Sequence, residues 1–504
     1  MSEMNRRGFV GKAAAGAFTI VPRHVLGGAP FVPPSDKVTM AHIGMGTQGF
    51  AEIGDLLADP KIQIVAVCDP NKESSDYVEW GKGSVRRRMR DYLGDSNWHA
   101  NDDGAPGGRE VGRLVVDTYY AKQRGADGFK GCAAYADFRE LLEKERDIDA
   151  VKVMTPDHLH ATICIAAMKK GKHVMVHKPL ANRMNEARLV IETARNTKVS
   201  THLMAYGSGR PNERVAGFIN QGIIGTLREI HNWSNRPVWP QYTEIPAERP
   251  PVPEGFEWDL WLGPAVERPY HPNYTHTVFR GWYEFGGGSM ADMGIYSLWP
   301  LFVALELESP VSAEAWASHV CKIIDQVSRP FKNDFSYPAA CTLRFRVPRK
   351  SEPAIELFWY DGGMRPRLPE EITSGDFRMG IEGILFVGDK GYILAGFRGE
   401  DAVLYANGKR EPLGEPEPRT RRGGGERQYT DERHRAWREA IHGGPHSPGS
   451  FLNAAAISDA VNLGTVALRA GKKVEFDAAQ MRITNDEAAN KYLFREYRKG
   501  WELS

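Results

Sequence analysis

The first half of the chain alternates short apolar runs with segments of helical periodicity. The apolar runs at residues 38–43, 62–68, 148–154, 173–176 and 199–205 predict buried strands, and residues 159–170 and 184–196 predict helices between them. Alternation of strands and helices is typical of a parallel sheet with crossover helices. We therefore expect an α/β domain over residues 36–206.

The pattern changes after Tyr206. Apolar runs at residues 227–235, 311–319, 339–347, 354–360, 381–387 and 392–395 predict strands with few long helices between them. Successive strands without crossover helices indicate an antiparallel or mixed sheet. Residues 207–504 should thus form a second, α+β domain with a large, mostly antiparallel open sheet and a C-terminal helix over residues 451–470.

Two segments lie outside this alternation. Residues 71–131 are rich in Gly, Asp and Arg and predict an insertion over one edge of the first domain, where such segments serve as lids or subunit contacts. In residues 1–35, Arg6-Arg7 precede a mildly apolar stretch that is too short to anchor the chain stably in a bilayer. This arrangement resembles a twin-arginine export signal and predicts an exported, periplasmic protein.

Composition narrows the classes of partner and site. The 504 residues carry a formal net charge of +1, which argues against a nucleic-acid-binding surface. The five cysteines lack the spacing of a metal site or of a disulfide framework, so we expect no metal. The expected partner is a small molecule.

A glycine-rich segment, Gly44-Met45-Gly46-Thr47-Gln48-Gly49, directly follows the first predicted strand. A G-x-G-x-x-G pattern between a strand and a helix lets the backbone approach a pyrophosphate, whose charge lies at the helix N-terminus. Asp69 ends the second strand, where a carboxylate binds the adenosine ribose hydroxyls. The segment predicts a Rossmann dinucleotide-binding domain with a cofactor site that includes Gly44, Gly46, Thr47, Gln48, Gly49 and Asp69.

Asp69 also bears on the choice of cofactor. A carboxylate at the ribose repels the additional phosphate of NADP, so the sequence favours NAD. The run Arg86-Arg87-Arg88 could instead reach such a phosphate, which keeps NADP as the less favoured alternative.

Further motifs follow in order along the chain. They are Thr155-Pro156-Asp157-His158-Leu159-His160, His177-Lys178-Pro179-Leu180-Ala181 and the glycine-rich segment from Gly286 to Tyr296. These motifs resemble the Thr-Pro-Asn-x-x-His, Glu-Lys-Pro and Asp-x-Gly-x-His signatures of the Gfo/Idh/MocA family, named for glucose-fructose oxidoreductase and inositol dehydrogenase. Trp258 to Pro264 and Asn490 to Trp501 are similar to a larger, secreted-type branch of that family, so the resemblance covers about residues 36–504.

The resemblance implies an oxidoreductase that acts on a secondary alcohol of a sugar, cyclitol or glycoside, and a homo-oligomer. It implies that Lys178 is catalytic, together with Asp292 and Tyr296, which are four residues apart and would share one helix face. It also adds to the cofactor site Thr155, Pro156, His158, His160, His177 and Lys178.

Two positions depart from the family pattern. His177 stands where Glu is usual, and Tyr296 stands where the family has the histidine expected to be the general base. A tyrosine normally titrates near 10 and needs a nearby cation, which Lys178 could provide. The alternative is that Tyr296 only packs and that Asp292, His160 or His177 accepts the proton.

Aromatic and polar residues between the two halves suit a polyhydroxylated ring. We expect substrate contacts from Trp239, Arg280 and Trp282. Three functions stay open: an NAD-dependent dehydrogenase with tightly held cofactor, a redox-neutral NAD-dependent glycoside hydrolase or lyase that passes through a transient keto-sugar, and a non-catalytic sugar-binding relative.

Overall fold

The computed structural model describes residues 37–124, 131–206, 211–331, 333–373, 378–414 and 434–503. The export signal expected in residues 1–35 lies outside these residues. Within them, no helix is long and apolar enough to cross a membrane.

The first half of the described chain contains a six-stranded sheet in which every neighbouring pair is parallel. In spatial order the strands are β5 (Ala133–Tyr135), β2 (Ile62–Cys68), β1 (Val38–Ile43), β6 (Ala150–Val153), β7 (His173–Val176) and β8 (Thr201–Leu203). The accompanying helices are α2 (Thr47–Ala58), α4 (Arg109–Arg124), α5 (Phe138–Lys144), α6 (His160–Lys169) and α7 (Met184–Thr197). The strand order reverses between β1 and β6, and ligands of such folds bind at the carboxyl ends of the strands beside this point. The predicted Rossmann architecture is confirmed.

Every residue of β1 and β2 is buried, as expected for central parallel strands covered on both faces. The turn from β1 into α2 depends on two glycines. Gly44 has φ of +100°, and a Cβ there would lie 2.5 Å from the carbonyl group of Met154. A Cβ on Gly49 would lie 2.4 Å from the Gly44 carbonyl oxygen. Only glycine therefore allows this close approach of β1, α2 and β6.

The predicted insertion contributes β3 (Ser74–Tyr77), α3 (Ser84–Leu93) and β4 (Ala105–Gly107) beside the glycine-rich turn. The Thr47 hydroxyl at the start of α2 donates to the Val78 carbonyl oxygen at 2.8 Å. The last part of the predicted segment has a different place, because α4 packs against β2 as the crossover helix between β2 and β5.

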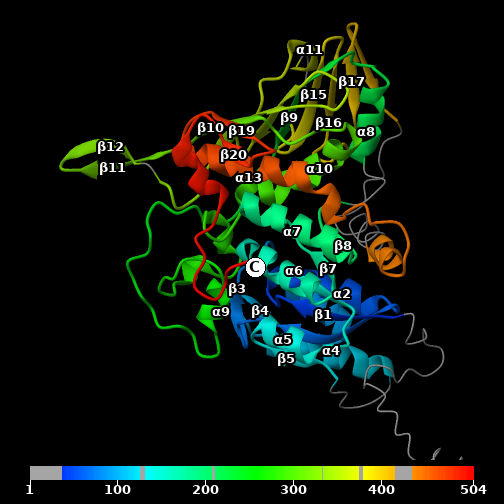
Figure 1. The fold of residues 1–504 in the computed structure, drawn as a ribbon, viewed down its shortest axis with the longest axis vertical. Helices are drawn as coiled ribbons and strands as arrows, with labels where there is room; N and C mark the ends of the chain where they lie inside the picture. Colours follow the sequence, from blue (N-terminus) through cyan, green and yellow to red (C-terminus); the bar gives the residue numbers. More distant parts are fainter. Residues whose placement is uncertain are drawn as a thin grey trace, which may run out of the picture.

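The second half of the described chain contains a ten-stranded sheet, antiparallel except where β9 pairs with β14. In spatial order the strands are β18 (Lys409–Pro412), β17 (Val403–Ala406), β16 (Tyr392–Ala395), β15 (Gly383–Gly388), β9 (Leu227–Trp233), β14 (Ile355–Tyr360), β13 (Cys341–Val347), β10 (Ser312–Ala317), β19 (Val474–Asp477) and β20 (Arg482–Ile483). A separate hairpin, β11 (Val320–Ile324) and β12 (Val327–Phe331), projects from the body of the protein (Figure 1). The predicted open, mostly antiparallel sheet is confirmed.

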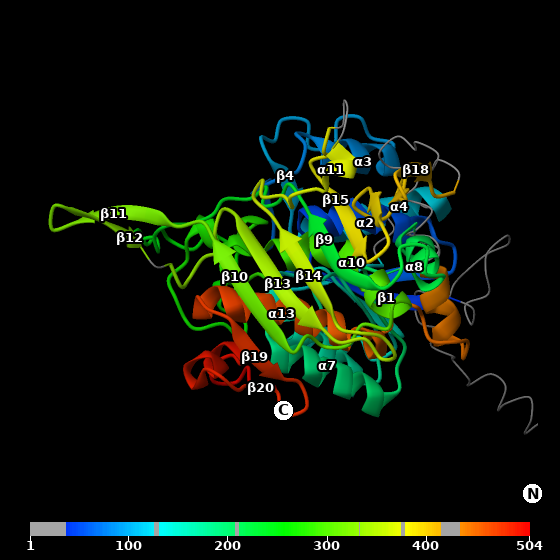
Figure 2. The same ribbon diagram turned by 90° about the horizontal axis from the view of Figure 1, so that it is seen from above.

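Helices separate the two sheets. Figure 1 shows α10 (Ile295–Ala304) and α13 (Ala455–Ala470) between the ten-stranded sheet and α7, and Figure 2 shows the strands crossing in front of α13. Further helical segments are α8 (Pro211–Asn220), α9 (Trp258–Leu262), α11 (Glu370–Thr373), η2 (Asp157–Leu159), η3 (Pro272–Tyr274), η4 (Val278–Gly281), η5 (Met290–Gly294), η6 (Phe451–Asn453) and η7 (Glu487–Leu493). Apolar residues of α7, α13 and both sheets form one continuous buried cluster.

The C-terminal segment returns to the first domain and holds the two halves together (Figure 1). The side chain of Arg495 is 1% exposed, and its guanidinium lies 2.7 Å from the carboxylate of Glu186 on α7 and 2.7 Å from that of Glu284. Glu284 precedes the glycine-rich segment that leads into η5. This buried ion-pair cluster fixes the position of η5 relative to the parallel sheet.

Candidate active site

A cavity of about 300 Å³ opens at the carboxyl ends of the parallel strands and extends to η5 and α10. It therefore lies at the point where the strand order reverses, as the sheet topology leads us to expect. The cavity brings together most of the residues that the sequence singled out: Gly44, Gly46, Thr47, Gln48, Asp69, Thr155, Pro156, His177, Lys178, Arg280, Asp292 and Tyr296.

One end of the cavity is formed by the glycine-rich turn and Asp69. The Asp69 carboxylate accepts hydrogen bonds from the backbone N–H groups of Met45 at 2.7 Å and Asn71 at 2.8 Å. Burial raises the pKa of Asp69 to about 6, although both backbone donors and Arg109 act in the opposite direction. These bonds hold the carboxylate beside the N-terminus of α2, where a dinucleotide needs it.

The arginine run does not reach this end of the cavity. The guanidinium of Arg86 donates to the Asp102 carbonyl oxygen, that of Arg87 to Lys82, and that of Arg88 to Ala51. None of the three arginines lines the cavity. Their side chains instead hold α3 and its neighbouring loops in place.

The opposite end contains a buried ion pair between Lys178 and Asp292. Lys178 follows β7 and Asp292 lies in the π-helical turn η5, so the pair joins the two domains. The Lys178 ammonium contacts the Asp292 carboxylate, which also lies 3.6 Å from the guanidinium of Arg280 and 3.7 Å from that of Arg236.

The surroundings of this ion pair determine what each group can do. Burial lowers the pKa of Lys178 to about 8, even though Asp292 acts in the opposite direction. Burial by itself would raise the pKa of Asp292, but Lys178, Arg280 and Arg236 hold that pKa well below its usual range. Asp292 is thus suited to balance charge rather than to accept a proton.

Tyr296 contacts the other residue that departs from the family pattern. Its hydroxyl lies 3.3 Å from His177 Nε2, and the Lys178 ammonium lies 5.4 Å from the centre of its ring. Burial and the charge of Lys178 hold the pKa of His177 well below its ordinary value, so the imidazole is neutral near pH 7 and its Nε2 can accept a hydrogen bond from the Tyr296 hydroxyl. His177 Nε2 also lies 3.5 Å from Glu52, which pairs with the fully buried Lys152.

Three predicted cofactor residues do not line the cavity. The ring nitrogens of His160 face the carbonyl oxygens of Pro179 and Thr155, and His158 Nε2 faces that of Trp261 at 3.0 Å. Both histidines are fully buried, so they position the surrounding loops, and the proton-accepting role considered for His160 is not supported by this geometry. Gly49 shapes the glycine-rich turn through its close packing against Gly44.

Among the predicted substrate residues, Arg280 lines the cavity whereas Trp239 and Trp282 do not. Trp282 is fully buried, stacks on Tyr242 and donates its indole N–H to the Asn273 carbonyl oxygen at 2.7 Å. The ring of Trp239 instead lies 5.6 Å from the Arg280 guanidinium carbon. The expected contact from Trp282 is therefore corrected to a place in the aromatic core.

Residues that the sequence did not single out complete the site. Trp80 of the insertion, Arg236 after β9 and Arg398 after β16 all line the cavity. None of these three residues belongs to a sequence motif. Each reaches the cavity from a loop whose position depends on the arrangement of both domains, so local sequence did not reveal it.

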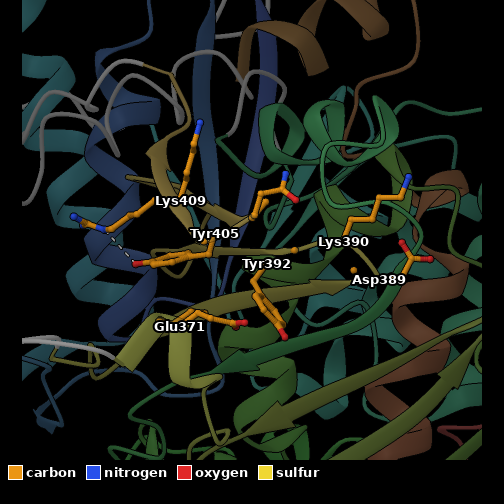
Figure 3. A pocket seen from close by; sticks show the side chains of 13 residues that line it. Glu371, Asp389, Lys390, Tyr392, Tyr405 and Lys409 are labelled. Carbon is orange, nitrogen blue, oxygen red and sulfur yellow. Dashed lines mark hydrogen bonds between the residues drawn. The ribbon is translucent and has the colours of Figure 1, made fainter.

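A second hollow lies at the outer end of the ten-stranded sheet, beside the β15–β16 and β17–β18 turns (Figure 3). Lys409 points away from Lys390 and Asp389 in this view, and all three side chains are exposed. The hollow therefore lacks the converging buried polar groups of the cavity between the domains.

Comparison with known sequences agrees with this arrangement. The profile of the oxidoreductase family with an NAD-binding Rossmann fold, GFO_IDH_MocA, matches residues 97–205. The profile of the C-terminal α/β domain of the same family matches residues 216–346 and 449–503, so the two together match more than half of the chain.

Curated relatives match over a limited part of their length. A glycosyl hydrolase family 109 protein of a Shewanella species is 25% identical over 39% of this chain and 34% of its own length. An alpha-N-acetylgalactosaminidase of Shewanella oneidensis is 26% identical, also over 39% of this chain and 34% of its own length. The match thus spans about a third of each relative.

Solved structures resemble the whole fold. The WlbA dehydrogenase of Bordetella pertussis, solved with NADH and UDP-GlcNAcA, has a TM-score of 0.52 at 12% identity over 88% of this chain and 99% of that one. A levoglucosan dehydrogenase solved with NADH and L-sorbose has a TM-score of 0.51 at 14% identity, over 87% of this chain and 98% of that one. With both family profiles matched in order and the fold shared, the chain belongs to the Gfo/Idh/MocA oxidoreductase family, and its first domain is an NAD-binding Rossmann domain.

Proposed function

We propose that this protein is an NAD-dependent oxidoreductase that oxidises a secondary alcohol of a sugar, cyclitol or glycoside. The observation that carries the proposal is the cluster of Lys178, Asp292, Tyr296 and His177 at one end of a cavity whose other end is the glycine-rich turn. When bound, NAD supplies the acceptor for the hydride of the substrate carbon.

The residues at the glycine-rich end fit the cofactor. Gly44 and Gly46 present backbone without side chains at the N-terminus of α2, where the helix dipole favours a pyrophosphate. The Asp69 carboxylate, held by two backbone N–H groups, is a suitable acceptor for ribose hydroxyls. Because none of the residues from Arg86 to Arg88 lines the cavity, we propose that NAD is preferred over NADP.

The proposed proton pathway uses Tyr296 and His177. As the alcohol is oxidised, its hydroxyl proton passes to the Tyr296 oxygen while the Tyr296 proton passes to His177 Nε2, where the Glu52 carboxylate at 3.5 Å favours the protonated imidazole. Lys178 stays protonated, donates to the substrate oxygen and stabilises negative charge that develops on the phenol oxygen. Asp292 keeps the ammonium of Lys178 charged within the buried site.

The proposal is tested by incubating the purified protein with NAD and a panel of sugars, cyclitols and glycosides. Absorbance of the reduced cofactor reports net oxidation, and we expect at least one substrate to give it. Lys178→Ala should lower kcat by about 100- to 10,000-fold while the Kd for NAD stays within a few fold. The matched control is Lys170→Ala, because that lysine lies on the surface and pairs with Glu143. Full activity of Lys178→Ala would contradict the assigned role.

A second candidate function is redox-neutral glycoside hydrolysis. It is favoured by the partial match to curated proteins named as glycosyl hydrolases of family 109. In this chemistry a transient keto group acidifies the neighbouring C–H, elimination expels the aglycone, and water adds before the keto group is reduced again. Aglycone release without net cofactor reduction, measured on the same panel, would establish this function in place of the dehydrogenase. Binding of sugar without either reaction would favour the non-catalytic alternative.

A tightly held cofactor is part of the proposal. If Arg6-Arg7 act as an export signal, the enzyme works where no pool of nicotinamide nucleotide is maintained and must retain its NAD. Tyr77 and Trp80 of the insertion line the cavity beside the glycine-rich turn and would slow its release. Assay of the supernatant after denaturation of the purified protein should therefore find NAD, and a preparation without bound NAD would contradict retention.

A further inference from the structure

Cationic side chains exceed anionic ones at the end of the cavity where the substrate must lie. Among the described residues, the cations that line this end are Lys178, Arg236, Arg280 and Arg398. The carboxylate that faces them is Asp292, because Asp69 lies at the other end beside the glycine-rich turn.

Two of these cations have buried partners. Lys178 contacts Asp292 directly. Arg280 lies 3.2 Å from Asp157, a carboxylate that is 1% exposed and also accepts the N–H of Gly287 at 2.9 Å. Two carboxylates thus balance Lys178 and Arg280.

The other two cations, Arg236 and Arg398, have no carboxylate of their own among the described residues. Arg236 shares Asp292, at 3.7 Å, with Lys178 and Arg280. Arg398 makes no ion pair with any described residue, and the nearby Glu400 carboxylate accepts the backbone N–H of Arg398 at 2.8 Å. No other described carboxylate lines the substrate end to balance them.

Both arginines are held beside the reacting groups. The guanidinium carbon of Arg398 lies 5.1 Å from the centre of the Tyr296 ring. That of Arg236 lies 5.9 Å from the Trp80 ring, and Arg236 also reaches the sulfur of Met293, next to Asp292. A substrate whose hydroxyl meets Tyr296 therefore lies within reach of both guanidinium groups.

The cofactor does not balance these charges. Its pyrophosphate belongs at the N-terminus of α2, at the glycine-rich end. Binding a neutral sugar would desolvate Arg398 without a counter-ion and Arg236 with only a share of Asp292, which is costly. The planar guanidinium fork instead suits a carboxylate or phosphate.

We propose that the substrate is an acidic sugar whose anionic substituent, a carboxylate or a phosphate, is bound by Arg236 and Arg398. The inference rests on the proposed function, since it assigns the substrate class of the same site. It also assigns specificity to two residues that belong to none of the sequence motifs.

The test compares neutral glycosides with acidic counterparts of the same configuration. Neutral gluco-, galacto- and manno-configured nitrophenyl glycosides are assayed beside the corresponding uronides and 6-phosphates, with both cofactor reduction and aglycone release recorded. We expect one acidic compound to exceed its neutral counterpart in kcat/KM by about 100-fold or more, as two charge-assisted contacts predict. Comparison of the uronides with the 6-phosphates shows whether the site prefers a carboxylate or a phosphate.

Variants test the assigned residues. Arg398→Gln and Arg236→Gln should each lower kcat/KM for the acidic substrate by about 10- to 100-fold and reduce the preference for charge, and Arg398→Lys should retain part of it. The control is Arg195→Gln, on the exposed face of α7, with thermal unfolding measured for every variant. Equal loss on acidic and neutral substrates would overturn the assignment.

Failure of this inference is distinguishable from failure of the proposed function. Turnover of neutral sugars without preference for charge would preserve the oxidoreductase and overturn the acidic substrate. Calorimetric binding of a uronide that is lost in Arg398→Gln, without turnover of any compound, would support the acidic ligand and contradict the enzyme.

Discussion

The Tyr296 hydroxyl lies 3.3 Å from His177 Nε2, and these two residues are also the two positions at which the chain departs from its family pattern. His177 follows β7 of the parallel sheet and Tyr296 lies in α10 of the second domain. The two departures therefore form one contact, so the proton acceptor of this site is best treated as a pair.

We predict that Tyr296→Phe and His177→Gln have non-additive effects. Each should lower kcat by about 100- to 10,000-fold, because each removes one member of the proposed proton pathway. The double variant should be no more than a few fold worse than the poorer single variant, since residues that act as a unit do not contribute independently.

Single-turnover measurements of the four proteins would establish this coupling. His446→Gln, at an exposed loop position, is the control. Multiplicative losses in the double variant would mean that Tyr296 and His177 act separately.

The pH dependence should report the charge of Lys178. Its pKa is lowered by burial to about 8, so the ammonium form is present below about pH 8 and is lost above it. If Lys178 acts as a cation, kcat falls as the pH rises through this value. If Lys178 is the general base, kcat rises with pH through this value instead.

The measurement is kcat at saturating substrate from about pH 6 to about pH 10. In Lys178→Arg the falling limb should move to higher pH, because a guanidinium stays protonated. An unchanged limb in that variant would assign the ionisation to another group.

Asp69→Ser should weaken the binding of NAD and reduce the preference of the protein for NAD over NADP. The substitution removes the carboxylate that we propose to bind the ribose hydroxyls and to repel the additional phosphate. Dissociation constants for both cofactors measure the effect, with Asp91→Ser on exposed α3 as control. A preference that does not change would show that cofactor choice lies elsewhere.

Arg495→Met should destabilise the protein by about 3 to 5 kcal/mol. Removing Arg495 from the buried ion-pair cluster leaves Glu186 uncompensated and leaves Glu284 with Arg183 at 3.5 Å. Denaturant unfolding of Arg495→Met measures the loss. Arg482→Met, which breaks an exposed pair with Glu487, should change little by comparison. Equal effects of the two substitutions would contradict a special role for the buried cluster.

The sequence by itself determined the features that depend on neighbouring residues. The glycine-rich turn was predictable because its strand, its glycines and its helix are contiguous, and only glycine tolerates the contacts at Gly44 and Gly49. The alternation of strands and helices predicted the parallel sheet, and its loss after Tyr206 predicted the mostly antiparallel one. Lys178, Asp292 and Tyr296 were found through short motifs in matching order.

Only the tertiary structure decided which side chains share the cavity. His158, His160 and Trp282 satisfy the local patterns, yet packing buries them against backbone carbonyls and aromatic rings. Arg236 and Arg398 have no local pattern, yet loops more than a hundred residues apart place both beside Tyr296 and Asp292. A side chain's burial, partners and pKa depend on groups that are distant in sequence, and for that reason local spacing does not determine them.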